Sequence, residues 1–332
     1  MTNMTSMTVA KSMKTATMIE RRWRQHHFRA MNTDVHVIHV NTGDDPAGAV
    51  EALFRRNERV MSRFDPSSDL SRLNGCRQGG CAVGPTLYAA LEVALWAAAA
   101  TGGIYDPTVL GDLQDAGYDR SFDLLVDRDD FCWQAESNVR EKWRIDHRRV
   151  HDYRSVTLQP DNRIVRRPSG LGIDLGGMGK GWSVDRSADL MHARGMPFLV
   201  NAGGDLYASG APGNAPGWDI DLEHPLRPGQ SVAHVQVKDR ALATSTVCRR
   251  QWQHHGRRQH HLIDPRTQAP AETDVLSVSV TAQRTVLAEI FAKVALILGA
   301  EAGLAYLEQL PGVEGMLFTV DEQTLFTTGF EQ

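Results

Sequence analysis

The chain has 332 residues, of which 42% are hydrophobic and 23% are charged, and its formal net charge is −4. This composition is ordinary for a globular protein, and the slightly negative charge argues against a general nucleic-acid-binding protein. No apolar run approaches the ~20 residues that a membrane-spanning helix needs, so we expect no membrane span.

The amino-terminal segment, up to about Gln25, is rich in Met, Thr and Ser and then turns basic. It contains neither the apolar core of a signal peptide nor a Cys that could carry a lipid. We interpret residues 1–27 as a disordered leader and residues 28–332 as one domain. The leader favours a cytoplasmic location.

The cysteines point to the same compartment. None of them forms a C-x-x-C pair: Cys76, Cys81, Cys132 and Cys248. This spacing indicates neither a zinc site nor a disulfide framework. We therefore expect reduced cysteines.

The hydrophobic pattern predicts helices and strands without an internal repeat or a linker between domains. In chain order the predictions are a strand over 34–40, helices over 47–61 and 87–100, a hairpin around 160–162, a helix over 180–194, a strand from 198 into a glycine turn at 203–205, and a helix with an apolar stripe from Leu287 to Leu298. Residues 63–74 are interpreted as a turn with a short polar stretch. Residues 119–155 are charged and irregular, with Trp133 and Trp143 as surface anchors. The fold class is α+β.

Residues 173–185 (IDLGGMGKGWSVD) are the most informative segment. Asp174 ends an apolar run, and glycines and Lys180 precede a predicted helix. Glycines let the backbone approach a bulky charged ligand and offer unpaired N–H groups, and the helix turns the positive end of its dipole toward the same place. The segment predicts a phosphate site with a carboxylate nearby for a metal or a hydroxyl. It matches neither a P-loop nor the G-x-G-x-x-G fingerprint, and a structural glycine-rich turn is the alternative.

Eight motifs follow one another between Met31 and Phe330, nearly everything after the leader. They are Met31–Thr33, Arg63–Asn74, Gly103–Thr108, Asp174–Asp185, Asn201–Asp205, Ala243–Ser245, His261–Thr267 and the helix with Ala288 and Glu289. In this order they resemble the ApbE family of FAD:protein FMN transferases. A single motif is weak evidence, whereas the complete order is specific.

The resemblance implies a single large domain with a mixed β-sheet flanked by helices. It also implies an enzyme that splits FAD, attaches the FMN half through a phosphoester to a Thr or Ser hydroxyl of a target flavoprotein, and releases AMP. Target sites of the family resemble Asp-x-x-Ser/Thr-Gly-Ala-Ser/Thr. Attack at a pyrophosphate needs neutralised phosphate charge and a base, and Mg²⁺ on oxygen ligands commonly supplies the neutralisation.

The resemblance also implies roles for individual residues. The FAD site would be lined by Met31, Phe64, Ile104, Tyr105 and Asp106, with Leu262 beside the flavin or the adenine and with Asp174 and Lys180 on the polar parts. The carbonyl of Gly177 and the carboxylate of Glu289 would face the metal. His261 would be the base for the acceptor hydroxyl, since a reference pKa near ~6.5 allows proton transfer at neutral pH.

Each of these roles has a structural alternative. His261 ends a His-rich run of the kind found in solvated turns. Met31 and Phe64 suit a hydrophobic core, Asp106 suits a plain turn, and the turn at 203–205 suits a purely structural role.

Two positions on the last predicted helix depart from the family pattern. Family members carry Asp and Thr there, four residues apart, as metal ligands, and this chain carries Glu289 and Lys293. Glutamate can bind Mg²⁺, but the lysine ammonium has no acceptor. Either Lys293 takes the place of the cation, pairing with Glu289 and touching the pyrophosphate, or the two form an exposed i,i+4 pair beside a decayed metal site.

Three family glycines are also replaced, by Asn32, Thr246 and Gln268, and a backbone shift follows wherever φ > 0 is required. The chain is thus identified as a diverged member. FMN transfer is the leading hypothesis. The alternatives are an FAD pyrophosphatase and a flavin-binding protein without turnover, which Lys293 favours.

Overall fold

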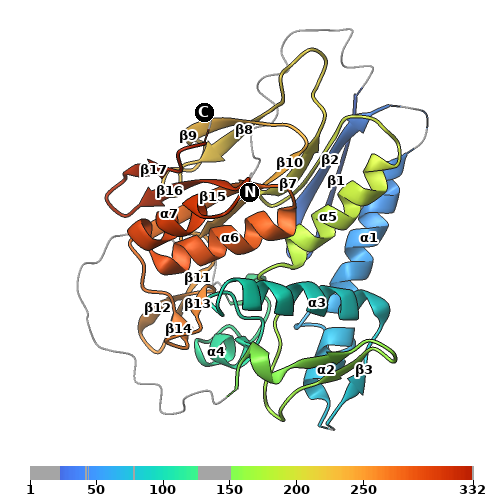
Figure 1. Ribbon diagram of the computed structural model, residues 1–332, viewed down its shortest axis with the longest axis vertical. Coiled ribbons are helices and arrows are strands. Elements are labelled where there is room, and N and C mark those ends of the chain that lie inside the picture. Colours follow the sequence, from blue (N-terminus) through green and yellow to red (C-terminus); the bar gives the residue numbers. More distant parts are fainter. Residues whose placement is uncertain (1–22, 42, 44, 78, 126–150, 331–332) are drawn as a thin grey trace.

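Eight strands form one antiparallel sheet through the molecule (Figure 1). The computed structural model describes residues 23–330 except 42, 44, 78 and 126–150. In sheet order the strands are β1 (Trp23–Ala30), β2 (Thr33–Val40), β6 (Phe198–Ala202), β7 (Asp205–Ser209), β10 (Arg240–Thr246), β15 (Val275–Ala282), β16 (Glu314–Thr319) and β17 (Thr324–Phe326).

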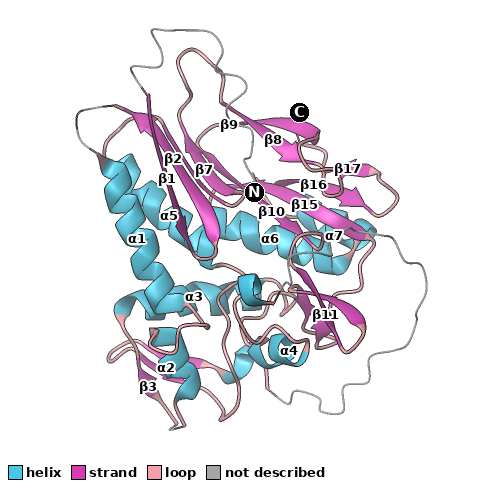
Figure 2. Ribbon diagram, turned by 180° about the vertical axis from the view of Figure 1, so that it is seen from behind, coloured by secondary structure: helices cyan, strands magenta, loops and turns pink. Residues whose placement is uncertain are grey.

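Helices cover one face of this sheet, and a two-stranded ribbon covers the other (Figures 1 and 2). The helices are α1 (Pro46–Met61), α5 (Gly179–His192), α6 (Thr285–Leu298) and α7 (Ala300–Glu308), and the ribbon pairs β8 (Trp218–Glu223) with β9 (Ser231–Val237). Under the ribbon, Trp218 and Ile220 share a buried cluster with Leu199 and Leu206 of the sheet. Both faces of the sheet therefore bury apolar side chains, and the predicted α+β class is confirmed.

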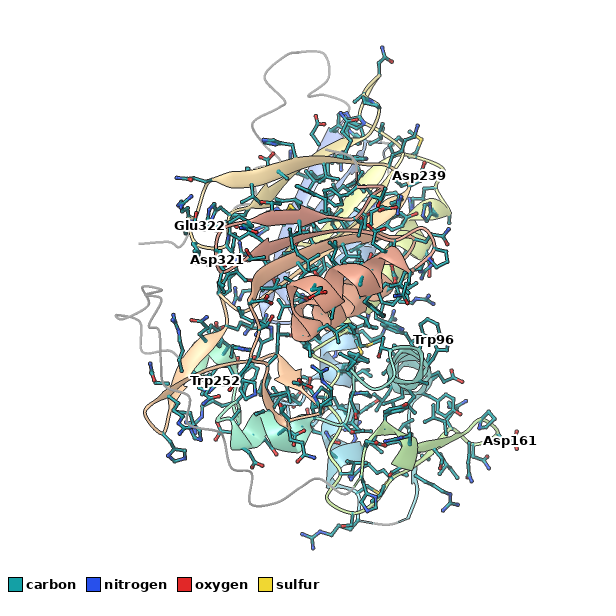
Figure 3. The ribbon with its side chains drawn as sticks, turned by 60° about the vertical axis from the view of Figure 1, so that its left-hand side comes forward. Trp96, Asp161, Asp239, Trp252, Asp321 and Glu322 are labelled. Atoms are coloured by element: carbon teal, nitrogen blue, oxygen red, sulfur yellow. A yellow bond between two sulfur atoms is a disulfide. The ribbon has the colours of Figure 1, made fainter. Side chains whose placement is uncertain are left out.

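A smaller layer lies below the helices in the view of Figure 1. It contains α2 (Asp69–Gly75), α3 (Pro85–Ala100), α4 (Leu110–Asp115), the strands β3 (Cys81–Ala82), β4 (Thr157–Gln159) and β5 (Ile164–Arg166), the hairpin β11 (Gln251–His254) with β12 (Arg257–His260), the pair β13 (Ile263–Asp264) with β14 (Ala269–Pro270), and 3-10 turns at Phe122–Leu124 and Tyr153–Ser155. Trp252 of β11 lies beside α4 (Figure 3) and donates from Nε1 to the carbonyl of Ala116 at 2.7 Å. This contact fixes the hairpin that leads into His261.

The predicted helices and strands are present, with bounds within a residue or two of the expectation. The interpretation of residues 63–74 as a turn with a short polar stretch is wrong from Asp69 onward, because Asp69–Gly75 form α2. Ser68 caps this helix by accepting a hydrogen bond from the N–H of Ser71 at 2.9 Å, and Leu70 and Leu73 are buried. Trp133 and Trp143 lie outside the described residues. No helix in the described ranges is long and apolar enough to cross a membrane.

The start of the domain was predicted too late. Residues 23–27, assigned to the leader, belong to β1, which pairs residue by residue with β2. Only Phe28 and Ala30 of this strand are buried, so its outward-facing Arg, Gln and His side chains make the sequence look like a polar leader. Residues 1–22 lie outside the described residues.

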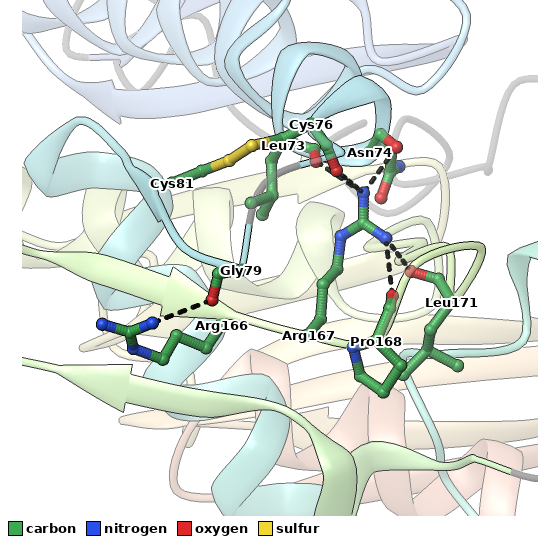
Figure 4. The surroundings of a disulfide bond; sticks show 9 residues. All are labelled: Leu73, Asn74, Cys76, Gly79, Cys81, Arg166, Arg167, Pro168 and Leu171. Carbon is green, nitrogen blue, oxygen red and sulfur yellow. Dashed lines mark hydrogen bonds between the residues drawn. A yellow bond between two sulfur atoms is a disulfide. The ribbon is translucent and has the colours of Figure 1, made fainter.

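The expectation of reduced cysteines is also wrong, since Cys76 and Cys81 form a disulfide (Figure 4). The five-residue separation brings the end of α2 against β3. Arg167 reinforces this corner by donating hydrogen bonds to main-chain carbonyls of Leu73, Asn74, Cys76, Pro168 and Leu171. The Asn74 side chain in turn bonds both the N–H and the carbonyl of Ile173, at 2.9 and 2.8 Å. The corner thus holds the residue that precedes Asp174.

Candidate functional site

A cavity of about 680 Å³ collects residues from the main sheet, from α6 and from the smaller layer. Every residue that the sequence proposed lines it: Met31, Phe64, Ile104, Tyr105, Asp106, Asp174, Gly177, Lys180, His261, Leu262 and Glu289. Lys293 lines it as well. Its volume lies in the ordinary range for a small-molecule site. The fold therefore brings these residues together, and their individual roles stay predictions.

The glycine-rich segment allows α5 to pack closely against the start of α6. A Cβ on Gly181 would lie 2.8 Å from main-chain atoms of Thr285, so only glycine permits this approach. The carboxylate of Asp185 accepts hydrogen bonds from the first two N–H groups of α6, at 2.7 and 3.1 Å, and so caps that helix. These contacts set the position of α6, which carries Glu289 and Lys293 into the cavity.

The N–H groups of three of these glycines are used within the protein. Gly176 donates to Asp174 at 2.9 Å, and Gly181 donates to Glu289 at 2.8 Å. Gly179 donates to a carbonyl of the preceding turn, also at 2.8 Å. The prediction of unpaired N–H groups is therefore wrong for these three, because carboxylates and the turn already satisfy them.

Lys180 lies between two buried carboxylates. Its Nζ contacts Asp205, and it lies 2.8 Å from Oε1 of Glu289. Burial lowers the pKa of Lys180, but the two carboxylates outweigh burial and raise it. Burial raises the pKa of Asp205 to about 6. For Glu289, Lys180 and Lys293 outweigh burial and lower the pKa, so Lys180 is a fully paired cation beside an ionised Glu289.

Lys293 lies one turn further along α6 and has no such partner. Among the described residues, no carboxylate lies within 4.0 Å of its Nζ. Its Cε would lie 3.2 Å from a Cβ on Gly177, so the side chain rests directly on that glycine. Burial lowers the pKa of Lys293 and outweighs the opposing attraction of Glu289.

This geometry contradicts the exposed pair and the direct Glu289–Lys293 pairing, and the replacement of the cation by Lys293 stays a prediction. The pair is not exposed, because Glu289 is 3% exposed. It is not a direct ion pair either, since Oε1 of Glu289 receives Lys180 and Oε2 receives the N–H of Gly181. Lys293 is left with its charge directed to the cavity.

Arg63 and Asp174 form a second charged group. Nε of Arg63 lies 2.8 Å from Oδ2 of Asp174, and both side chains are buried. The guanidinium lies over the rings of Phe64 and Tyr118, 4.2 and 4.4 Å from their centroids, which is a cation–π arrangement. Phe64 is nonetheless 38% exposed. An aromatic surface is thus available to a ligand ring.

His261 is held as a neutral imidazole. Burial lowers its pKa well below the ordinary value, and the positive charges of Arg250 and Lys293 lower it further. Its Nδ1 is buried without a hydrogen-bond partner in the described part of the chain. The same is true of Nη2 of Arg63 and Oη of Tyr105. Buried polar atoms are normally bonded, so three orphans around one cavity point to a polar ligand.

The three residues that replace family glycines differ in their backbone conformation. Asn32 and Gln268 adopt φ values of 56° and 59°, the left-handed region that glycine favours. Met31 does the same at 53°, and its N–H donates to Glu58 at 2.9 Å. Thr246 lies in β10. The turns therefore keep their backbone conformation without glycine, with Asn32 the best suited residue.

The two predicted turns also differ. The Asp106 carboxylate accepts hydrogen bonds from the N–H and the hydroxyl of Thr108, at 2.8 and 2.6 Å, so it has the expected turn role while lining the cavity. The turn at 203–205 serves the fold. Gly203 and Gly204 adopt φ values of 63° and 103°, and the turn delivers Asp205 to Lys180.

The described residues do not fit a Mg²⁺ site. In these ranges, no group of three or more His, Cys, Asp or Glu side chains is arranged to hold a metal. Both oxygens of Glu289 are engaged by protein donors, and Lys293 supplies an ammonium instead of an oxygen ligand. The predicted metal role of Glu289 has no support in this geometry.

The sheet and its helices form one side of a cavity whose lining includes cationic and aromatic side chains, which suits a ligand with an anionic part and a ring. A sequence model described as the ApbE family matches residues 31–317. The chain therefore belongs to the ApbE family.

Relatives and solved structures agree with this assignment. An "FAD:protein FMN transferase" of Treponema pallidum is 32% identical over 295 residues, covering 84% of this chain and 78% of the relative. An "FAD:protein FMN transferase" of Vibrio cholerae is 28% identical, and the match covers 79% of this chain and 76% of the relative. The ApbE protein of Thermotoga maritima has a similar fold, with a TM-score of 0.80 at 22% identity and coverage of 93% and 99%. The flavin transferase ApbE of Vibrio cholerae also has a similar fold, with a TM-score of 0.75 at 22% sequence identity, and the match covers 93% of this chain and 98% of that structure.

Sequence reasoning missed three residues that line the cavity, Arg63, Tyr118 and Arg250, and it missed Asp205, which contacts Lys180. Arg63 immediately precedes Phe64 in its motif, and Asp205 ends the glycine turn, so both had a local signal. Tyr118 and Arg250 lie outside the motifs, and only the fold brings them to the cavity.

Proposed function

We propose that this protein is an FAD:protein FMN transferase, which moves the FMN part of FAD to a Thr or Ser hydroxyl of a target protein and releases AMP. The observation that carries the proposal is that a neutral imidazole, His261, and an ammonium without an ion pair, Lys293, line the same cavity. The transferases of Treponema pallidum and Vibrio cholerae support it by sequence similarity.

In this proposal the rings of FAD bind the apolar part of the cavity, at Met31, Phe64, Ile104 and Leu262. The orphan donors Nη2 of Arg63 and Oη of Tyr105 meet polar atoms of the ligand. Burial raises the pKa of Tyr105 well above its ordinary value, so this phenol stays a neutral donor. Asp174 and Lys180 line the polar end and, being paired already, keep its shape.

The transfer step is a substitution at phosphorus. The acceptor hydroxyl oxygen bonds to the phosphorus of the FMN half, and the bond from that phosphorus to the oxygen bridging the two phosphates breaks. AMP leaves with the bridging oxygen and its electron pair. His261 takes the hydroxyl proton, because its lowered pKa leaves a lone pair free across the neutral range. The negative pyrophosphate offsets Arg250 and Lys293 and so raises the basicity of His261 when FAD is bound.

The partner is a flavoprotein with an Asp-x-x-Ser/Thr-Gly-Ala-Ser/Thr-like site. Arg250 supports this choice, since it lines the cavity and forms no ion pair with any described residue. Its guanidinium is available to the acidic residue of such a site.

The cytoplasmic location stays a prediction from the leader. The Cys76–Cys81 disulfide argues against it, because disulfides persist mainly in oxidising compartments.

The test is to incubate the full chain with FAD and a candidate acceptor domain and to weigh the acceptor by mass spectrometry. We expect the acceptor to gain the mass of one FMN moiety, and we expect its Thr→Ala form to gain nothing. His261→Gln should abolish the gain, whereas His255→Asn, in the exposed turn of the same His-rich run, should keep it. AMP and FMN without a modified acceptor would identify a pyrophosphatase. Bound, intact FAD would identify a flavin-binding protein.

A further inference from the structure

We propose that Lys293 replaces a divalent cation at the pyrophosphate, so that this protein transfers FMN without a metal. The inference rests on the proposed function and deepens it. It concerns the positive charge that neutralises the phosphates. Electrostatic stabilisation of the transition state is the contribution on which attack at phosphorus depends most.

The carboxylates near the polar end are already engaged. Glu289 gives one oxygen to Lys180 and the other to the N–H of Gly181, each at 2.8 Å. Asp205 is 1% exposed and contacts the same Lys180. A divalent ion would have to displace a buried ammonium from both of them, and breaking such a cluster is costly.

The backbone does not neutralise the phosphates either. The N–H groups of Gly176, Gly179 and Gly181 donate within the protein. The Gly177 N–H is not among these donors, but an N–H group carries only a partial charge, so a full positive charge in the glycine-rich corner must come from a side chain. Lys180 is saturated by its carboxylates and Arg63 is paired with Asp174. Lys293 and Arg250 are left in the cavity lining, and Lys293 is the one whose side chain rests on Gly177.

The position of Lys293 suits this role. It projects from α6, which Asp185 and Gly181 anchor to α5, and its stem rests on Gly177. No ion pair with the described residues competes for its ammonium. A partly buried cation without a counter-ion is unfavourable in the free protein, and an anionic ligand removes that cost. The Lys293 ammonium stabilises the negative charge of the pyrophosphate in bound FAD and of the phosphate in the leaving AMP. The bonds formed and broken in the transfer step are unchanged.

The first experiment compares metal-free and metal-supplied protein. The full chain, stripped with EDTA and passed over chelating resin, is assayed by acceptor mass with FAD and then again with added Mg²⁺. We expect rates equal within about two-fold in the two arms. Mn²⁺ titrated into the FAD complex and followed by electron paramagnetic resonance should show no tight binding. Transfer that requires Mg²⁺, or one tightly bound Mn²⁺, overturns the inference and leaves the proposed function standing.

The second experiment changes the residue. Lys293→Met should lower kcat/KM by about 100-fold or more and weaken metal-free FAD binding measured by calorimetry. The matched control Lys238→Met, at an exposed lysine, should change neither. Lys293→Thr also removes the ammonium and leaves the Lys180 cluster unchanged, so it should be as impaired as Lys293→Met with or without Mg²⁺. Unchanged FAD binding in Lys293→Met contradicts the inference. Absence of transfer in every arm of the wild type refutes the proposed function instead, and the FAD-binding and Mn²⁺ measurements still decide the role of Lys293.

Discussion

Two lysines line the same cavity and have opposite surroundings. Lys180, at the start of α5, lies between Asp205 and Glu289. Lys293, on α6, has the glycine-rich turn beside it and no carboxylate among the described residues within ion-pair distance. A charge that the protein satisfies internally serves the fold, and a charge that it leaves unsatisfied is available to a ligand. The comparison predicts that the two lysines contribute to different properties, one to stability and the other to binding.

The largest effect is expected at Lys180. Lys180→Met leaves Asp205 and Glu289 close together in the interior without their shared cation. We expect the free energy of unfolding to fall by about 3–5 kcal/mol, as it does when one partner of a buried ion pair is removed. Urea unfolding followed by circular dichroism measures this loss, with Lys238→Met as the surface control. A loss below about 1 kcal/mol would mean that the cluster is not the structural element inferred here.

A region remote from both lysines gives the next effect. Cys76→Ser with Cys81→Ser opens a loop with a sequence separation of five, which corresponds to about 2 kcal/mol of stability in the chain-entropy description. Dithiothreitol should lower the melting temperature of the wild type and leave that of the double variant unchanged. Equal sensitivity of the two proteins to dithiothreitol would exclude this disulfide as the cause.

The Lys180 cluster also predicts a pH dependence. Burial raises the pKa of Asp205 from 3.8 to about 6 in the folded protein. As the pH falls, Asp205 therefore takes up its proton at a higher pH in the folded state than in the unfolded state. This contribution to stability is fully present below pH 3.8 and is lost as the pH rises through about 6. Its slope is at most about 1.4 kcal/mol per pH unit. We expect the wild type to lose stability relative to Asp205→Asn as the pH rises from 4 to 7, because Asn does not titrate. Urea unfolding of both proteins over this range measures the difference. A flat difference would contradict the raised pKa.

The smallest effect on stability is expected at Lys293. Because it has no ion pair to lose, Lys293→Met should change the free energy of unfolding by less than about 1 kcal/mol. The same urea experiment as for Lys180→Met gives this value, and the contrast between the two variants is the sharpest form of the comparison. A loss as large as that of Lys180→Met would make both lysines structural.

Much of the fold followed from local pattern. The helix over 47–61 could be predicted because its apolar periodicity reflects one buried face. The strand from Phe198 could be predicted from a continuous apolar run, since it is buried on both faces, and the hairpin around 160–162 from its turn residues. The first strand and α2 could not. The first strand is polar on its exposed side. Helix α2 is only seven residues long with two buried apolar residues, and its end is held by a disulfide to β3.

The sequence by itself determined the motif set and hence the family, the α+β class and the group of residues that line the cavity, because each of these is encoded in short segments. The tertiary structure alone decided which charges meet. Residues 180, 205 and 289 lie on three different elements, and only packing shows that Lys180 neutralises the two carboxylates while Lys293 does not. The physical reason is that hydrogen bonds and ion pairs depend on distances of a few ångströms between distant segments, which spacing along the chain does not record.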